Sequence, residues 1–217
     1  MGEGNEDPVH LPHGTLSRFL STPDVLAIAR ELVGKVLITR IDGATTAAMI
    51  TETEAYAGIT DRASHAWNGR RTVRTGIMYA PGGTAYVYLC YGIHHLFNVV
   101  TNLQNIPHAV LIRAVEPLEG VETMMLRRSY HKVTPQLTSG PGSLSVALGI
   151  NTAHSGISLH GNTITIEDRQ TGITTAMLTA TPRIGVAYAG ADALLPYRFF
   201  LTDSPWVSKG KYLTALP

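Results

Sequence analysis

The sequence predicts an α+β fold, a single domain with a mainly antiparallel β-sheet. Hydrophobic residues make up 44% of the 217 residues, which is enough for a packed core. Runs with the alternation of β-strands predominate, and glycine turns join several of them into hairpins. No internal repeat, low-complexity tract or change of composition divides the chain.

The first helix is expected in STPDVLAIARELVG, residues 21–34. The serine and threonine at its start can cap it, its apolar residues recur at helical spacing, and Gly34 can end it. The polar stretch before it predicts a disordered tail over 1–13 and leaves one domain over 14–217.

Strands and hairpins dominate the next part of the chain. Residues 35–40 and 46–56 alternate like strands, and Asp42-Gly43 between them is typical of a hairpin turn. The apolar runs 84–91 and 96–100 flank a glycine turn and predict a second hairpin.

The remaining segments are a long loop, another strand, two helices and weak strand signals. The loop from Gly58 to Gly83 is longer than a plain connection, and such loops are usually functional or disordered. Residues 108–117 predict a strand, helical spacing returns in 117–128, and a proline opens a short helix over 141–150. Short β-type stretches follow at 158–168, 182–190 and 197–201.

TETEAY, residues 51–56, carries the first candidate chemistry. Every second side chain of a strand shares a face, so Glu52, Glu54 and Tyr56 should point the same way. The plain alternative is a solvated surface, because antiparallel sheets often have one wet side. A basic, aromatic loop and an aromatic hairpin follow directly, which favours a functional face.

Two further segments suit nucleic acid. Tyr91 falls near the hairpin tip, where an aromatic ring can act as a wedge between stacked bases. Tyr86 and Tyr88 share a strand face and can stack on bases, although tyrosines in strands are also common core residues. A glycine-bounded loop adds charges suited to phosphate contacts, or simply to solvation: Arg70, Arg71 and Arg74. The net charge of +1 neither favours nor excludes such a partner.

Other reaction classes have less support. Acidic and histidine residues lie near one another in sequence, but no metal-binding motif or serine nucleophile elbow is present, so no metal or cofactor is expected. The lone Cys90 lies in an apolar run and is expected to be a small buried side chain. No segment approaches the length of a membrane span, so we expect an intracellular protein without a membrane partner, located in the cytoplasm (at the nucleoid) if it is bacterial.

Together, TETEAY, the loop histidine, TAYVYLCYG and LIRAVEPLEGVETM resemble the alkyladenine DNA glycosylase family, also called methylpurine or 3-methyladenine DNA glycosylases. The resemblance continues through SGPGSLSVALGI, RIGVAYAG and SPWVS. It implies a compact domain with a curved sheet, flanking helices and a protruding hairpin. It also implies an enzyme without a metal, cofactor or lyase activity, which hydrolyses the bond between a damaged purine and its deoxyribose in double-stranded DNA. Nothing in the sequence requires more than a monomer, so a monomer is expected. The implied lesions include 3-methyladenine, 7-methylguanine, hypoxanthine and ethenoadenine.

The resemblance also implies roles for individual residues. The general base falls on Glu54, the arginine beside the attacking water falls on Arg113, and Glu52 is left as a structural residue. The residues implied in the base pocket are Tyr56, His65, Tyr88, Asn98 (which would screen out guanine) and Leu111. Those implied in DNA contacts are Tyr91 as the intercalating wedge, Ile93, Arg70 and Arg74.

The chain departs from the family pattern at the DNA-facing edge. Trp67 stands where the family has an arginine, and the hairpin carries His94 and His95 where a more aromatic sequence is expected. Two alternatives stay open: a non-catalytic nucleic-acid-binding module on the same scaffold, and a metal-dependent hydrolase using the acidic and histidine residues.

Overall fold

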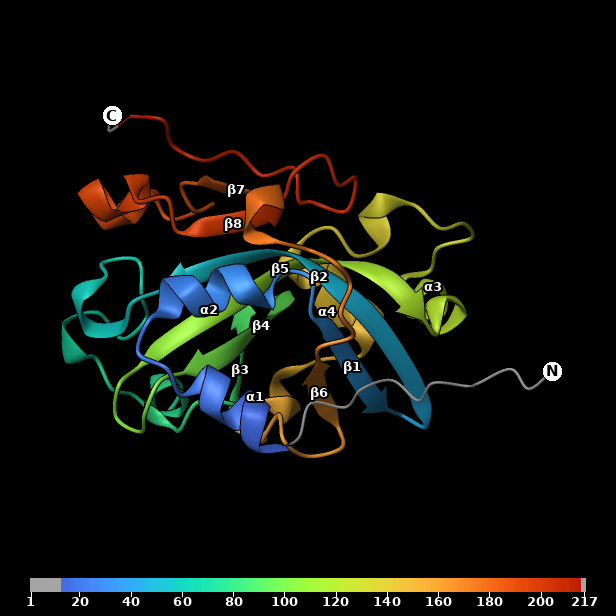
Figure 1. Ribbon diagram of the computed structural model, residues 1–217, viewed down its shortest axis with the longest axis horizontal. Coiled ribbons are helices and arrows are strands. Elements are labelled where there is room, and N and C mark those ends of the chain that lie inside the picture. Colours follow the sequence, from blue (N-terminus) through green and yellow to red (C-terminus); the bar gives the residue numbers. More distant parts are fainter. Residues whose placement is uncertain (1–12, 216–217) are drawn as a thin grey trace.

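The sheet is organised around one long strand, β2 (Ala44–Tyr56), in the computed structural model of the protein, which describes residues 13–215. β2 pairs with β1 (Val36–Ile41), β5 (His108–Glu119) and β8 (Arg198–Leu201). The remaining strands are β3 (Ala85–Cys90), β4 (His94–Thr101), β6 (Ile164–Glu167) and β7 (Leu178–Thr181). The main path runs β3-β4-β5-β2-β1-β6, and β8 adds β7 beyond β2. All pairs among these strands are antiparallel and the sheet curls, which confirms the predicted fold class (Figure 1).

Both predicted hairpins form, and both turns use positive backbone angles. Asp42 and Gly43 have φ of 55° and 73° between β1 and β2. Tyr91 and Gly92 have φ of 51° and 75° after β3, and the Ile93 N–H closes this turn on the carbonyl of Cys90 at 3.1 Å. Positive φ at both central positions is the pattern of a type I′ turn, whose twist matches that of the flanking strands.

Four α-helices occur in the described part of the chain: α1 (His13–Leu20), α2 (Val25–Leu32), α3 (Val121–Arg128) and α4 (Pro141–Leu148). The last three were predicted, whereas α1 was not. The N-cap of α2 is Asp24, whose side chain accepts from the backbone N–H groups of the first turn at 2.9 and 3.0 Å. The serine and threonine expected as caps instead donate to carbonyls at the end of α1. None of the described helices has the length and apolar character needed to cross a membrane.

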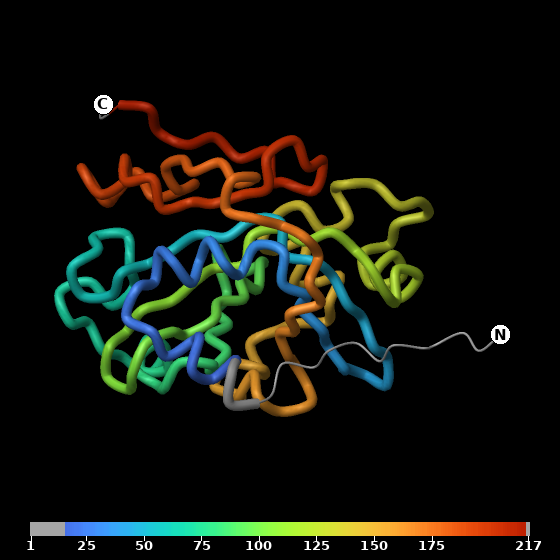
Figure 2. The backbone as a smooth tube through the Cα atoms, in the orientation of Figure 1, coloured from blue at the N-terminus to red at the C-terminus, as the bar shows by residue number. Residues whose placement is uncertain are grey.

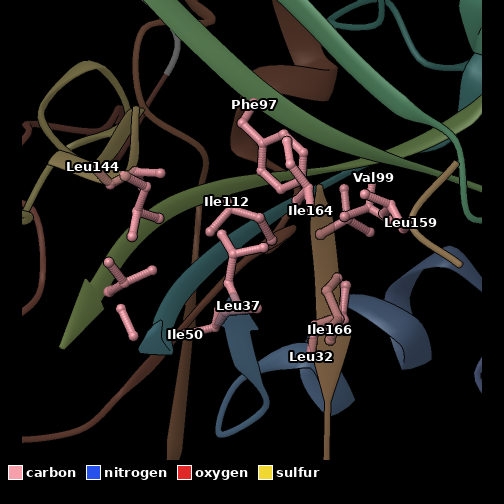
Figure 3. Close-up of a cluster of buried hydrophobic side chains, with 14 of the residues drawn as sticks. Leu32, Leu37, Ile50, Phe97, Val99, Ile112, Leu144, Leu159, Ile164 and Ile166 are labelled. Atoms are coloured by element: carbon pink, nitrogen blue, oxygen red, sulfur yellow. The ribbon is translucent and has the colours of Figure 1, made fainter. Parts of the chain in front are cut away.

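Apolar side chains fill the space between one sheet face and the helices. Phe97 and Ile112 from the sheet lie with Leu32 of α2 and Leu144 of α4 in this core, as Figure 3 shows. The side chains of Glu54 and Tyr56 alternate with those of the core, so they project from the opposite face. The core thus fixes which face of β2 is left for a site.

Two segments differ from their predictions. Residues 187–194 form an irregular 3-10 segment rather than part of a β-stretch, because short apolar runs do not distinguish strand from helix. The strand β7 was not predicted. The loop after β2 is ordered by three 3-10 turns at Gly58–Thr60, Trp67–Gly69 and Thr75–Tyr79. The other 3-10 turns are Pro135–Leu137, Thr152–His154 and Thr175–Met177.

The tail expected over 1–13 lies outside the described residues except for His13, where α1 begins.

Candidate active site

The pairing of β2, β5, β4 and β3 places four side chains in one row across the sheet. Glu54 on β2 pairs with Leu111 on β5, Leu111 pairs with Asn98 on β4, and Asn98 pairs with Tyr86 on β3. Directly paired residues of an antiparallel sheet share a face. Residues far apart in the sequence therefore come together on the face opposite the core.

The carboxylate of Glu54 is fully buried, with 0% of the residue exposed. Its Oε1 accepts from the backbone N–H of Ile184 at 2.7 Å and lies 3.2 Å from Nη1 of Arg113. Its Oε2 accepts from the hydroxyl of Tyr56 at 2.8 Å. A carboxylate offers about four acceptor positions, so these three contacts leave one position on Oε2 unused.

A cavity of about 910 Å³ lies directly beyond these contacts. Tyr56, Arg113 and Ile184, which hold Glu54, all line it. Three further expected pocket residues do so as well: His65, Tyr88 and Leu111. Asn98 does not line the cavity; it is 4% exposed, and its Nδ2 donates to the carbonyls of Tyr86 and Leu96. The volume falls in the range of pockets that hold small organic molecules.

Aromatic rings make one wall of the cavity. The ring centroids of His65 and Tyr88 lie 4.6 Å apart, edge to face, and Tyr86 and Tyr88 lie 5.5 Å apart. Burial lowers the pKa of His65 to about 4, and the charges of Arg74 and Arg70 act in the same direction, so its imidazole is neutral at pH 7. Burial, followed by the charge of Glu54, raises the pKa of Tyr56 well above its usual value. Tyr56 therefore stays a hydroxyl and a hydrogen-bond donor to Glu54.

Comparison with known proteins decides the family. The family model described as "Methylpurine-DNA glycosylase (MPG)" matches residues 18–205. A protein of Chlamydia felis named "Putative 3-methyladenine DNA glycosylase" is 48% identical over 184 residues, which cover 84% of this chain and 93% of that one. The chain belongs to the methylpurine-DNA glycosylase family. Proteins with the same name from Chlamydia pneumoniae and Desulfitobacterium hafniense are 45% and 42% identical, covering 90% and 89% of this chain and 97% and 98% of theirs.

Membership of the methylpurine-DNA glycosylase family gives the class of chemistry. The protein is a DNA-repair hydrolase that acts on the bond between a base and its deoxyribose. The described residues include no group of three or more histidine, cysteine or acidic side chains that could hold a metal ion. The metal-dependent alternative therefore has no such ligand set within residues 13–215.

In this glycosylase, Glu52 belongs to a buried network of charges. It is 0% exposed, so the alternative of a solvated carboxylate at this position is wrong. Its Oε1 accepts from Nε of Arg113 and from Nε of Arg198, each at 2.7 Å. Burial alone would raise the pKa of Glu52, but the charges and hydrogen bonds of the two arginines outweigh it and hold the pKa below its usual value.

A second ion pair supports Tyr56 from outside the cavity. Arg183 pairs with Asp61 through Nη1 and Nη2, at 2.5 and 2.9 Å, and its charge lies 4.8 Å from the centre of the Tyr56 ring. Sequence reasoning assigned no role to Arg183, Asp61 or Ile184. RIGVAYAG, which contains Arg183 and Ile184, contributes to the family resemblance without pointing to either role.

Two of the four residues expected to contact DNA line the cavity. Tyr91 is 90% exposed and Ile93 69% exposed at the hairpin tip, and Tyr91 and Arg70 line the cavity. Arg74 lies with its charge 6.0 Å from the centre of the Tyr88 ring. Trp67 and His94, the departures from the family pattern, also line the cavity, whereas His95 does not.

Cys90 corrects a prediction. Its side chain is partly exposed at the cavity edge rather than buried. Partial burial raises the pKa of its thiol, which disfavours the reactive thiolate.

Proposed function

We propose that this glycosylase rotates a damaged purine out of double-stranded DNA into the cavity and hydrolyses its glycosidic bond with a water activated by Glu54. The observation that carries the proposal is the buried Glu54 carboxylate, held by three residues that line an aromatic cavity. The relatives are named for 3-methyladenine, and related lesions such as 7-methylguanine, hypoxanthine and ethenoadenine are proposed as further substrates.

The base must leave the duplex before it can react, because its glycosidic bond is buried there. Tyr91 would fill the vacated space from the exposed hairpin tip, with Ile93 beside it. Arg70 and Arg74 would bind phosphates, which positions the duplex without reading its sequence. We expect the protein to act as a monomer.

Inside the cavity, Tyr56 would stack on one face of the purine, and His65 and Tyr88 on the other. An alkylated purine is electron-poor or cationic, so aromatic faces attract it more strongly than a neutral base. The neutral state of His65 supports this role, because an imidazolium would repel a cationic base. Asn98 does not line the cavity, so its proposed exclusion of guanine requires its amide to leave the carbonyls of Tyr86 and Leu96 when a base enters.

The hydrolysis uses the free acceptor position of Glu54. A water bound there would give its proton to Glu54 while its oxygen attacks the sugar carbon C1′. The bond from C1′ to the purine nitrogen breaks, and its electron pair leaves with the base. The negative charge of Glu54 stabilises the positive charge that develops on the sugar, and Arg113 anchors the water.

The test is the variant Glu54→Gln, with the exposed Glu31→Gln as a matched control. Duplexes with one defined lesion are mixed with excess protein, and base release is scored as strand breaks after alkali. We expect Glu54→Gln to lose at least about a hundredfold in rate, as for removal of a general base, while its affinity for the lesion duplex is kept.

Three outcomes would contradict the proposal. Base release by Glu54→Gln within a few-fold of the unmodified rate would remove the carboxylate from the reaction. Binding without any base release by the unmodified protein would support the non-catalytic binding module. Loss of activity in EDTA would support the metal-dependent hydrolase.

A further inference from the structure

The reaction proposed above gives no task to Glu52, although it lies in the same charged network. This carboxylate accepts four hydrogen bonds: two from arginine Nε atoms, one from the Ser208 hydroxyl at 2.8 Å, and one from the Ser208 backbone N–H at 2.6 Å. Buried charges carry a large desolvation cost, and replacing a whole buried ion-pair network by well-packed apolar residues is often neutral or stabilising. Core packing alone therefore does not account for an acid at this position.

The guanidinium of Arg113 is shared between the two carboxylates of β2. Its Nε donates to Glu52 at 2.7 Å, its Nη1 lies 3.2 Å from Glu54, and its Nη2 donates to the Ser208 hydroxyl at 3.2 Å. Each nitrogen has a different partner. Because the group is planar and rigid, three separate contacts define a single orientation.

In that orientation only one nitrogen of Arg113 reaches Glu54. An arginine free to turn prefers a bidentate pair, with two nitrogens on the two oxygens of one carboxylate. Such a pair on Glu54 would add a contact to Oε2, which otherwise accepts only from Tyr56. It would then occupy the fourth acceptor position, where the attacking water is proposed to bind.

We propose that Glu52 is a positioning residue that holds Arg113 in single-nitrogen contact with Glu54 and so keeps one acceptor position of Glu54 open for water. This inference rests on the proposed function and extends it to a residue that does not touch the base. Arg198 and Ser208 hold Glu52 in turn, since together they supply three of its four hydrogen bonds.

The network also explains why the acid must be charged. Two carboxylates, Glu52 and Glu54, balance two guanidinium groups, Arg113 and Arg198, in a region where each residue is at most 6% exposed. A neutral side chain at position 52 would leave Glu54 as the only carboxylate for Arg113 in this set. The arginine would then be drawn onto the oxygen that the reaction needs.

The test is Glu52→Gln, which keeps the shape and removes the charge. We expect a 10- to 100-fold slower single-turnover base release, about the cost of losing an outer partner of a metal ligand, with unchanged affinity for the lesion duplex. A crystal structure of the variant should show Arg113 contacting both oxygens of Glu54. The matched control is Glu167→Gln on β6, which also removes a buried acid paired with an arginine but lies outside this network.

A second variant, Ser208→Ala, tests the same inference if Glu52→Gln does not fold. Ser208→Ala removes one hydrogen bond to Glu52 and the partner of Nη2 on Arg113. It should slow base release in the same direction by a smaller factor, again without a change in affinity. A purely structural role would instead lower the melting temperature and leave the rate of the folded protein unchanged.

The outcomes separate this inference from the proposed function. If Glu54→Gln is inactive and Glu52→Gln or Ser208→Ala releases base at the unmodified rate, the positioning role is wrong and the proposed function stands. The same holds if the variant structure keeps Arg113 in single-nitrogen contact. If Glu54→Gln releases base normally, both the proposed function and this inference are wrong.

Discussion

The imidazole of His65 is an example of chemistry set at the scale of one residue. Burial and two neighbouring arginines lower its pKa to about 4, and its Nδ1 lies 3.0 Å from the hydroxyl of Tyr86. The folded protein therefore keeps this ring neutral over a pH range in which an exposed histidine gains a proton. That state has a cost to stability that can be measured.

We predict that His65 makes the folded protein less stable as the pH falls from about 6.5 to about 4, by at most about 1.4 kcal/mol for each pH unit, the limit for one proton. Below about 6.5 the unfolded chain binds a proton at this histidine. The folded chain does not bind it until the pH nears 4. In His65→Gln this part of the pH dependence should be absent. Urea unfolding at pH 7.5 and pH 5 measures it, with the exposed His131→Gln as control.

An identical loss of stability in His65→Gln and the unmodified protein would show that the ring is not held neutral. The comparison between variants is needed because other groups also titrate in this range. His108, for example, has a pKa lowered by burial.

At the scale of elements, the hairpin of β3 and β4 combines a local strain with an exposed aromatic ring. Tyr91 has a φ of 51°, a left-handed conformation that costs about 1–2 kcal/mol for residues other than glycine and asparagine. The turn would prefer asparagine followed by glycine. A bulky residue held in such a conformation is typical of functional sites, which supports the wedge role.

We predict that Tyr91→Asn raises the free energy of unfolding by about 0.5–1 kcal/mol and weakens lesion binding by about 1–3 kcal/mol, the value of one base stack. Urea unfolding and titration of a lesion duplex measure the two effects. The control is Asp42→Asn, at the matching position of the other hairpin, which should leave DNA affinity unchanged. A destabilised Tyr91→Asn variant with normal affinity would contradict both expectations.

Elements with local signals were predictable from the sequence, and those defined by distant contacts were not. Asp42-Gly43 and Gly92 mark their turns directly, and both hairpins formed where expected. The stretch 197–201 was correctly read as β-type, but nothing local indicates that its strand pairs with the end of β2. The small apolar residues of 187–194 fit either state, and Gly190, with φ 59° and ψ −130°, breaks the segment into turns.

At the scale of the whole molecule, the segment after β8 supplies the last hydrogen bonds to the buried network of Glu52, Arg113 and Arg198. Figure 2 shows this C-terminal stretch running beside β8. Its backbone accepts a hydrogen bond from Thr51 at the carbonyl of Trp206, and it donates one to Glu52 from Ser208. Farther along, Tyr212 forms an isolated β-bridge with Ile184, the residue whose N–H holds Glu54.

We predict that truncation after Val207 lowers the free energy of unfolding by at least about 1.5 kcal/mol, the value of one hydrogen bond to a charged group. It should also slow base release, because Glu52 and Ile184 lose their support. Thermal unfolding and the single-turnover assay test this. Truncation after Ala215 is the control, since it removes only residues 216–217. Full activity of the protein truncated after Val207 would show that the hydrogen bonds from this segment are not needed for base release.

The candidate site was predictable in part for the same physical reason. Strand alternation alone placed Glu52, Glu54 and Tyr56 on one face. Arg113 entered only through the family resemblance, and its orientation depends on Ser208, 95 positions away. Arg198 lies 146 positions from Glu52, so no local pattern connects the two.

These separations also determine when the enzyme becomes competent during its synthesis. Glu54 is translated early, but its backbone donor at Ile184 lies 130 positions later, and the serine that secures Glu52 lies 156 positions after that acid. A nascent chain therefore contains β2, with the proposed general base Glu54, long before that carboxylate can accept its hydrogen bond from Ile184. Such long-range contacts form late and slowly. We therefore expect incomplete chains to lack base-excising activity until the segment around Ser208 has been synthesised and has left the ribosome.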